Sequence, residues 1–479
     1  MAITNQPGLS TLSQLTRWIE QTDHHAPHRL KLIDRVDAAL SEDSLSTFEE
    51  RISIATQLER WRYQLLNERR ANGDDRETNE DLNTKLLAEM DRCFQLLRGT
   101  ESTTAAFRSP RNPRAAIFGD DVESENASAW IDCSFPLADL EAEAKQLTDR
   151  YFTTSEAAGN KAKRRMVLYA PIYVSSECVN HCKYCGFRYP MQIHRTHLNL
   201  EQVLDQSRIL RKRGFKHQLV VAGDYPSRTS TAYFCELIEA LAQQDLQIGI
   251  EIAAQSTESY AAMASAGARS VTLYQETYDE SVYESVHIRG PKASFDWRLE
   301  APERAAEVGF GRVGFGILLG LADPTQDFLS LIRHGFYLQR RFPNLDLAFS
   351  FPRIHEAPDD FEIPYQISDD DLVRFYCATR MLFPQSHLVL STRESAELRA
   401  RLAHLCITQM SAGSSTAPGG YADNSNESQP ESMETDPDCD RLKPTLQLMG
   451  EQFPVTDERS VEEVADWLAE EGFEVCWSF

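Results

Sequence analysis

Residues 166–189 read MVLYAPIYVSSECVNHCKYCGFRY, which joins a long apolar run to three closely spaced cysteines. Its first nine residues form a nearly continuous apolar run, which is typical of a strand buried on both faces of a parallel sheet. The run leads into a loop with three cysteines at CxxxCxxC spacing, Cys178, Cys182 and Cys185. Barrel enzymes place their reactive groups in such loops, at the carboxyl ends of strands.

Seven further β-type runs follow, and the stretches between most of them are long enough for a helix. The runs are residues 217–223, 247–253, 270–276, 312–321, 345–351, 387–393 and 405–412. Eight strands that alternate with helices over roughly 250 residues predict an α/β fold, a (β/α)8 TIM-type barrel.

Two flanking regions complete the predicted architecture, which is a barrel with a helical N-terminal extension and a small C-terminal helical tail. Residues 1–130 are expected to form the extension and a linker (100–128) rich in Ser, Thr, Pro and charge, before a barrel domain at 131–421. Residues 422–479 are expected to form an acidic loop and a tail that packs on the barrel. In the tail, Ser460 and Glu463 have the spacing of a helix capping box.

The composition excludes several classes of function. The 479 residues carry a formal charge of −24, which repels nucleic acid and anionic membrane surfaces, so we expect neither as a partner. No stretch approaches the roughly 18 apolar residues of a membrane span, and no basic segment precedes an apolar run at the N-terminus. We therefore expect a cytoplasmic protein.

The cysteine spacing has three interpretations. Three thiolates from one tight loop can bind three irons of a cubane iron–sulfur cluster and leave the fourth iron open to a small ligand. A structural zinc site needs a fourth ligand; His181 lies inside the loop, but zinc sites usually pair a CxxC with a distant second pair. Inert buried thiols are the third interpretation. The spacing favours the cluster.

SECVNHCKYCGFRY resembles the motif of the radical S-adenosylmethionine (SAM) family, in which an aromatic residue, here Tyr184, precedes the third cysteine. The resemblance implies a [4Fe-4S] cluster on the three cysteines and SAM on its open iron. One electron from the cluster would cleave SAM to a 5′-deoxyadenosyl radical. The second run ends in Gly223-Asp224, where the family usually has Gly-Glu to bind the SAM amino group. Asp224 is one methylene shorter.

The ends of later runs resemble a narrower branch, the aromatic-amino-acid lyases of this family. The matching segments are YQETY (274–278), WRL (297–299), SFPR (350–353), STRES (391–395), SAGSST (411–416) and PGGY (418–421). By this resemblance Glu276 and Arg298 help to hold SAM, and Gly316 contacts its adenine. Ser350 and Arg353 would hold the carboxylate of the amino-acid substrate.

The resemblance implies a carbon–carbon lyase that cleaves L-tyrosine to 2-iminoacetate (dehydroglycine) and p-cresol for thiamine thiazole biosynthesis. Implied partners are a reductant such as flavodoxin or ferredoxin, and thiazole synthase. The rival tyrosine lyase of [FeFe]-hydrogenase maturation carries a second cysteine cluster near its C-terminus. After residue 421 this sequence has only Cys439 and Cys476, which favours the thiamine branch. A lyase for another aromatic amino acid, or a metal-stabilised binding scaffold, remains as an alternative.

Overall fold

The computed structural model describes residues 32–36, 38, 54, 58, 61, 113–119, 124–132, 134–154, 162–358, 361–421 and 451–479. The chain divides into two compact units, Met1–Ala115 with 256–258 and 340–343, and the remaining residues. Up to residue 61, every described residue is helical, and Ile54, Leu58 and Trp61 are buried at helical spacing. The rest of the predicted extension up to residue 112, and the predicted acidic loop at 422–440, lie outside the described residues.

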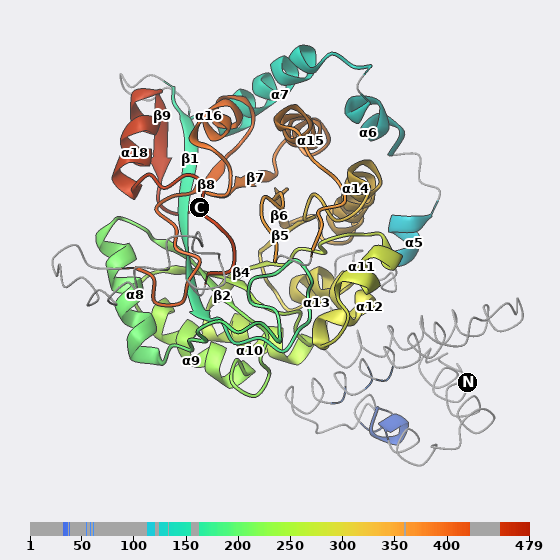
Figure 1. Ribbon diagram of the computed structural model, residues 1–479, viewed down its shortest axis with the longest axis vertical. Helices are drawn as coiled ribbons and strands as arrows, with labels where there is room; N and C mark the ends of the chain where they lie inside the picture. The colour runs from blue at the N-terminus through green and yellow to red at the C-terminus, as the bar shows by residue number, and fades with distance from the viewer. Residues whose placement is uncertain are drawn as a thin grey trace, which may run out of the picture. The chain divides into compact units, whose positions relative to one another are not determined.

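Eight parallel strands form a closed barrel in the second unit (Figure 1). They are β1 (Arg164–Ser175), β2 (His217–Ala222), β3 (Gln247–Glu251), β4 (Ala268–Thr272), β5 (Arg312–Gly316), β6 (Asp346–Ser350), β7 (His387–Leu390) and β8 (Gln409–Ser411). Each strand pairs with the next, and β8 pairs with β1. The predicted (β/α)8 barrel is confirmed, and all eight strands overlap the predicted runs.

Helices cover the barrel. They are α7 (Leu137–Phe152), α8 (Leu200–Lys212), α9 (Thr231–Ala242), α10 (Thr257–Ala266), α11 (Glu280–Val286), α12 (Phe295–Leu299), α13 (Ala301–Glu307), α14 (Pro324–Arg341), α15 (Asp369–Leu382), α16 (Ala396–Leu405) and the one-turn η2 (Pro291–Ala293). Of these, α8, α9, α11, α15 and α16 begin at residues whose side chains cap them. The side chains of Asn199 and Ser368 each accept a backbone N–H three residues later, and both sites are complete capping boxes.

Part of the predicted linker is helical. The segment 100–128 contains α5 (Pro113–Phe118) and the beginning of α6 (Ser124–Ile131). Pro113 is the first residue of α5, where a missing N–H costs nothing because that group has no intrahelical partner. The Ser, Thr and Pro content that predicted a linker is thus also compatible with short helices.

The C-terminal tail contributes a ninth strand that the sequence analysis did not predict. β9 (Phe473–Cys476) pairs in parallel with the first residues of β1, from Arg164 to Val167 (Figure 1). The backbone N–H groups of Lys216 and His217 both donate to the carbonyl of Trp477, so the segment also reaches the start of β2. β9 therefore supplies hydrogen-bond partners for the first residues of β1, which come before the part of β1 that pairs with β2.

The predicted helix of the tail is confirmed as α18 (Val461–Glu470), with the Ser460–Glu463 capping box formed in both directions. Its Val464 and Leu468 are buried. Before this helix, Asp457 forms an ion pair with Arg399 of α16, and both side chains are almost fully buried. These contacts fix the tail on the barrel.

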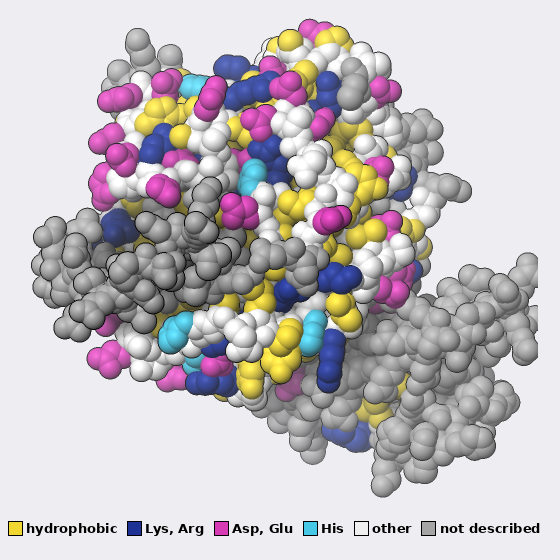
Figure 2. Space-filling view, viewed as in Figure 1, with side chains coloured by type: hydrophobic (Ala, Val, Ile, Leu, Met, Phe, Trp, Pro, Cys, Tyr) yellow, Lys and Arg dark blue, Asp and Glu magenta, His cyan; other side chains and the backbone are white. Residues whose placement is uncertain are grey.

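The described helices include none with the length and apolar character of a membrane span. On the face of the barrel unit shown in Figure 2, Asp and Glu side chains are scattered among basic and apolar ones. The described acidic side chains on this face therefore form no single patch.

Candidate active site

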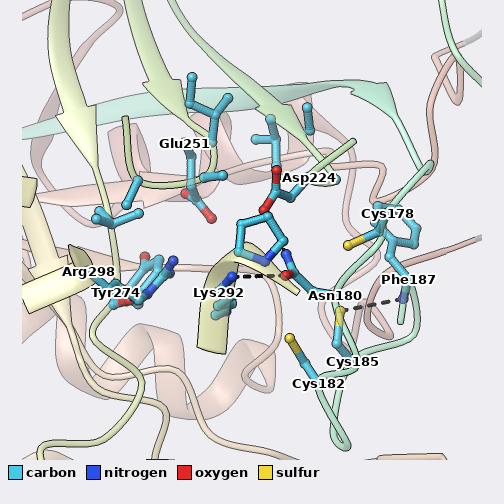
Figure 3. A pocket seen from close by; sticks show the side chains of 18 of the residues that line it. Cys178, Asn180, Cys182, Cys185, Phe187, Asp224, Glu251, Tyr274, Lys292 and Arg298 are labelled. Atoms are coloured by element: carbon cyan, nitrogen blue, oxygen red, sulfur yellow. Dashed lines mark hydrogen bonds between the residues drawn. The ribbon is translucent and has the colours of Figure 1, made fainter. Parts of the chain in front are cut away.

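The three cysteines line one cavity at the carboxyl ends of the strands. Cys178, Cys182 and Cys185 lie in the loop after β1 and border a space of about 810 Å³, called the cysteine cavity below. Figure 3 shows their sulfur atoms on one side of it. The loop is held by Arg195, whose guanidinium donates to four backbone carbonyls between residues 176 and 191 at 2.6–3.2 Å.

The three cysteine sulfurs fit an iron–sulfur cluster. Burial raises the pKa of Cys178 and Cys182, and the charges of neighbouring thiolates raise it further. Iron would reverse this effect, because a metal-bound thiol loses its proton. The backbone N–H of Phe187 points at the Cys185 Sγ at 3.4 Å, a contact of the kind that tunes clusters. No three His, Cys, Asp or Glu side chains among the described residues are arranged to hold a single ion. A cubane cluster does not require this, since each cysteine binds a different iron.

Glu276 is at the centre of a buried charge network in the same cavity. Its Oε1 accepts from Lys292 Nζ at 2.6 Å and from Arg298 Nη2 at 3.3 Å. Burial alone would raise the pKa of Glu276, but the two cations outweigh burial and lower it, so this carboxylate is ionised at neutral pH. Its backbone φ is 74°, a left-handed conformation that persists in a non-glycine residue only where the surroundings enforce it.

Asp224 lies in the cysteine cavity with a different partner. Its Oδ2 accepts from Asn180 Nδ2 at 2.8 Å, and burial raises its pKa while this hydrogen bond opposes the rise. The preceding Gly223 allows the cysteine loop to approach β2, since a Cβ there would lie 2.4 Å from the carbonyl oxygen of Glu177. Both predicted positions therefore border the cavity, and the shorter Asp224 is oriented by Asn180.

A second cavity of about 910 Å³, called the arginine cavity below, extends the site. Residues that line both cavities are Cys185, Val221, Glu251, Tyr274, Glu276, Lys292 and Gln452. Ser350 and Arg393 line the second one, and the Arg393 guanidinium lies 3.5 Å from the centre of the Phe453 ring. Tyr184 also borders this cavity, but its hydroxyl is within 2.8 Å of His287 Nε2, and the side chain is buried.

Arg353, predicted to hold a substrate carboxylate, does not appear in the lining of the described cavities. Its Nε donates to Glu394 at 3.1 Å, its Nη2 also contacts Glu394, and its Nη1 lies 2.9 Å from both the Ile367 carbonyl and Asp369. The guanidinium is therefore committed to protein partners, whereas Arg393 has its only side-chain hydrogen bond within the described residues at 3.5 Å.

Gly316, predicted to contact adenine, is likewise missing from the lining of the described cavities. A Cβ at this position would lie 1.9 Å from the carbonyl oxygen of Ser350 and 3.0 Å from the Tyr274 ring. The glycine is therefore required by the close packing of β5 against β6.

Gly316→Ala is expected to destabilise the barrel by about 1–3 kcal/mol, because a rigid backbone oxygen occupies the space of the new methyl group. Gly311→Ala is the matched control, since nothing lies within 4 Å of a Cβ there. Urea unfolding of both variants measures the difference. Equal midpoints for the two variants would contradict the packing role.

Two family models match the chain. The Radical SAM superfamily model matches residues 172–334, and the Biotin and Thiamin Synthesis associated domain matches residues 350–474. The 2-iminoacetate synthase of Escherichia coli (strain K12) is 34% identical over 343 residues, which cover 71% of this chain and 82% of that protein. The chain belongs to the radical SAM lyases related to 2-iminoacetate synthase.

Solved structures agree with this membership. The crystal structure of HydG, a maturase of the [FeFe]-hydrogenase, superposes with a TM-score of 0.64 at 29% identity, covering 76% of this chain and 75% of that one. Methylornithine synthase (PylB) shares the fold, with a TM-score of 0.54 at 20% identity and coverage of 76% and 97%. The predicted family is confirmed, and a radical SAM lyase implies SAM and an iron–sulfur cluster as cofactors.

Several residues of this lyase site were missed by the sequence analysis. Lys292 follows no strand end, whereas Asn180 lies in the loop after β1, between Cys178 and Cys182. The roles of both depend on contacts with Glu276 and Asp224. Gln452 comes from beyond the acidic segment. It accepts from the Tyr173 hydroxyl at 2.9 Å, and its Nε2 lies 3.8 Å from the Cys185 Sγ. No local pattern points to Lys292 or Gln452, whereas the place of Asn180 inside the cysteine motif was a usable signal.

Proposed function

We propose that this lyase cleaves the Cα–Cβ bond of L-tyrosine to 2-iminoacetate and p-cresol, with 5′-deoxyadenosine and methionine as co-products. The observation that carries the proposal is the shared wall of the two cavities, since Cys185, Glu276 and Lys292 line both. A cofactor at the cysteines would thus lie beside a cavity whose Arg393 suits an amino-acid carboxylate. The identity with the Escherichia coli 2-iminoacetate synthase supports tyrosine and a role in thiamine thiazole synthesis.

We assign Cys178, Cys182 and Cys185 as ligands of a [4Fe-4S] cluster with SAM beside it in the cysteine cavity. When bound, this pair supplies a 5′-deoxyadenosyl radical through one-electron cleavage of the sulfonium. Three polar side chains of the chain would fix SAM. Asp224, oriented by Asn180, and the ionised Glu276 offer acceptors for its amino group, and Arg298 offers a cation for its carboxylate.

Gly223 supports this arrangement by letting the cysteine loop lie against β2. We keep Tyr184 as part of the wall near the cofactor, because its ring borders the arginine cavity and lies 5.6 Å from Lys292 Nζ. For Gly316 we propose a packing role in place of the adenine contact.

Arg393 and Ser350 are our candidates for binding the tyrosine carboxylate. Arg393 replaces Arg353 in this role because the donors of Arg353 are already used, and we propose that Arg353 positions Glu394 and the strand ends instead. Anchoring the carboxylate fixes the amino nitrogen relative to the cofactor, which matters because a radical attacks the nearest group.

Loss of one hydrogen atom from the amino nitrogen weakens the Cα–Cβ bond of tyrosine. Homolysis of that bond gives 2-iminoacetate, with a C=N double bond, and a 4-hydroxybenzyl radical. One electron and one proton convert this radical to p-cresol. We propose flavodoxin or ferredoxin as the source of electrons, and thiazole synthase as the consumer of 2-iminoacetate.

The maturase function of HydG is the second candidate because that structure is similar. Beyond residue 421 the chain has two cysteines, Cys439 and Cys476. Cys476 lies on β9, where its Sγ is 3.3 Å from Arg165 Nε. This favours one cluster per chain.

Anaerobic reconstitution with iron and sulfide, followed by addition of reductant and SAM, tests the assignment. We expect about four irons per chain, against about eight for a two-cluster maturase. In a panel of tyrosine, tryptophan and phenylalanine, tyrosine should stimulate 5′-deoxyadenosine formation most strongly. Stronger stimulation by tryptophan would show that the substrate assignment is wrong.

A further inference from the structure

Glu251 is the last residue of β3, and its carboxylate is assigned to neither the cluster, nor SAM, nor the substrate carboxylate. It lines the cysteine cavity, the arginine cavity and a third space inside the barrel, so it lies where all three meet. Figure 3 shows its side chain pointing from the end of β3 into the cysteine cavity. A side chain at this junction can reach a molecule that occupies either of the two upper cavities.

The backbone of Glu251 pairs with β2, but within the described part of the chain its carboxylate has no hydrogen-bond or ion-pair partner. The other two acidic side chains of the cysteine cavity are paired, Asp224 with Asn180 and Glu276 with Lys292 and Arg298. The nearby hydroxyl of Tyr173 is used as well, since it donates to Gln452 at 2.9 Å. The carboxylate is only partly buried and opens onto the cavities, so its acceptors are available to a ligand bound there.

The charges around Glu251 indicate the kind of group that it binds. Arg393 exerts the strongest effect of any neighbouring charge on Glu251, ahead of Glu276, Arg298 and Lys292. An α-amino acid carries a carboxylate and an ammonium on one carbon atom, so a cation and an unpaired carboxylate facing one cavity match it. Arg298 and Lys292 already neutralise Glu276, which leaves Arg393 and Glu251 as the complementary pair.

We propose that Glu251 binds the α-ammonium group of the amino-acid substrate and removes one proton from it. This inference rests on the proposed function, because it assumes that the arginine cavity holds an amino acid. In the step, one N–H bond breaks heterolytically, its electron pair stays on nitrogen, and the proton forms the carboxylic acid of Glu251. No oxidant or reductant is involved.

The radical reaction requires this step. An ammonium nitrogen has no lone pair to stabilise an unpaired electron, so a hydrogen atom is removed far more readily from the neutral amine. Burial raises the pKa of Glu251 to about 7, despite the opposing charge of Arg393, which suits a group that accepts a proton near neutral pH. The groups that face it are Arg393, Arg298, Lys292, Glu276, Tyr169, Tyr173 and Tyr274.

The binding test measures the affinity of three amino-acid-like ligands for the enzyme that already holds its cluster and SAM, under anaerobic conditions. They are L-tyrosine, 3-(4-hydroxyphenyl)propanoate, which lacks the amino group, and L-phenylalanine, which lacks the phenol. Wild type should bind tyrosine about 10- to 100-fold more tightly than the deamino acid, as expected for a charged hydrogen bond. In Glu251→Gln this ratio should fall to within about threefold, while the ratio of tyrosine to phenylalanine stays unchanged.

Other outcomes would overturn the proposal. A loss of tyrosine–phenylalanine discrimination would place Glu251 at the phenol, and weaker SAM binding with unchanged ligand ratios would place it at the cofactor. An unchanged preference for tyrosine over the deamino acid would show that Glu251 does not bind the ammonium group. Glu236→Gln on α9 is the control, because Glu236 is exposed.

A kinetic test examines the proton transfer. Glu251→Gln should lower tyrosine turnover by about 100- to 10,000-fold, and Glu251→Asp should recover part of the rate. Full turnover in Glu251→Gln would overturn the proton transfer. If wild type makes no p-cresol, the proposed function fails, but the binding ratio can still be measured with any amino acid that binds. Absence of amino-acid binding would refute both.

Discussion

Cys182→Ala is expected to abolish the visible absorption of the reconstituted cluster and to reduce 5′-deoxyadenosine formation by more than about 100-fold. Loss of a metal ligand should cost at least as much as loss of a residue that only supports one. Cys182 is 4% exposed and lines the cysteine cavity, so solvent cannot easily replace its sulfur as a ligand.

Cys235→Ala is the matched control for this experiment. Cys235 lies on α9, is partly buried and does not line the cysteine cavity. Iron content, absorption and SAM cleavage should stay at wild-type levels in this variant. A Cys182→Ala enzyme that keeps its cluster and activity would refute the assignment of the triad, whatever the substrate is.

Arg393→Ala is expected to lower kcat/KM for tyrosine by about 30- to 3,000-fold, equivalent to about 2–5 kcal/mol for the loss of one partner of a desolvated charge pair. SAM binding should not change, because Arg393 lines the arginine cavity and not the cysteine cavity. Arg393→Lys should restore only part of the loss, since an ammonium cannot form the two parallel hydrogen bonds of a guanidinium.

Arg353→Ala provides the contrast. Glu394 would lose its principal partner while only 3% exposed, so we expect a stability loss of about 3–5 kcal/mol. Among the molecules that remain folded, the KM for tyrosine should change much less than in Arg393→Ala. The opposite result, with KM raised only by Arg353→Ala, would restore the assignment made from the sequence.

The two arginines show what the sequence could and could not reveal. Both follow strand ends, in SFPR and STRES, and the barrel pattern correctly places both near the carboxyl ends of strands. Which guanidinium is free depends on Glu394, which lies beside Arg393 in the sequence but binds Arg353 in space. Only tertiary structure distinguishes them.

Other errors have similar causes. The four residues of β9 become a strand because the first residues of β1 offer unpaired backbone groups, and no local pattern reports that. Glu251 was included in a predicted run at 247–253, and the structure ends β3 at this residue. The eight barrel strands, β1 to β8, were predictable because each is a distinct apolar run, and most are followed by a segment long enough for a helix.

Production of p-cresol from tyrosine is the measurement that tests the central claim most directly. The reconstituted enzyme, with reductant, SAM and uniformly ¹³C-labelled L-tyrosine, should form labelled p-cresol and labelled 2-iminoacetate, detected as glyoxylate after hydrolysis. Both products should appear in about equal amounts and in step with 5′-deoxyadenosine, since each cleavage uses one radical. Continued formation of 5′-deoxyadenosine with no labelled p-cresol would contradict the account.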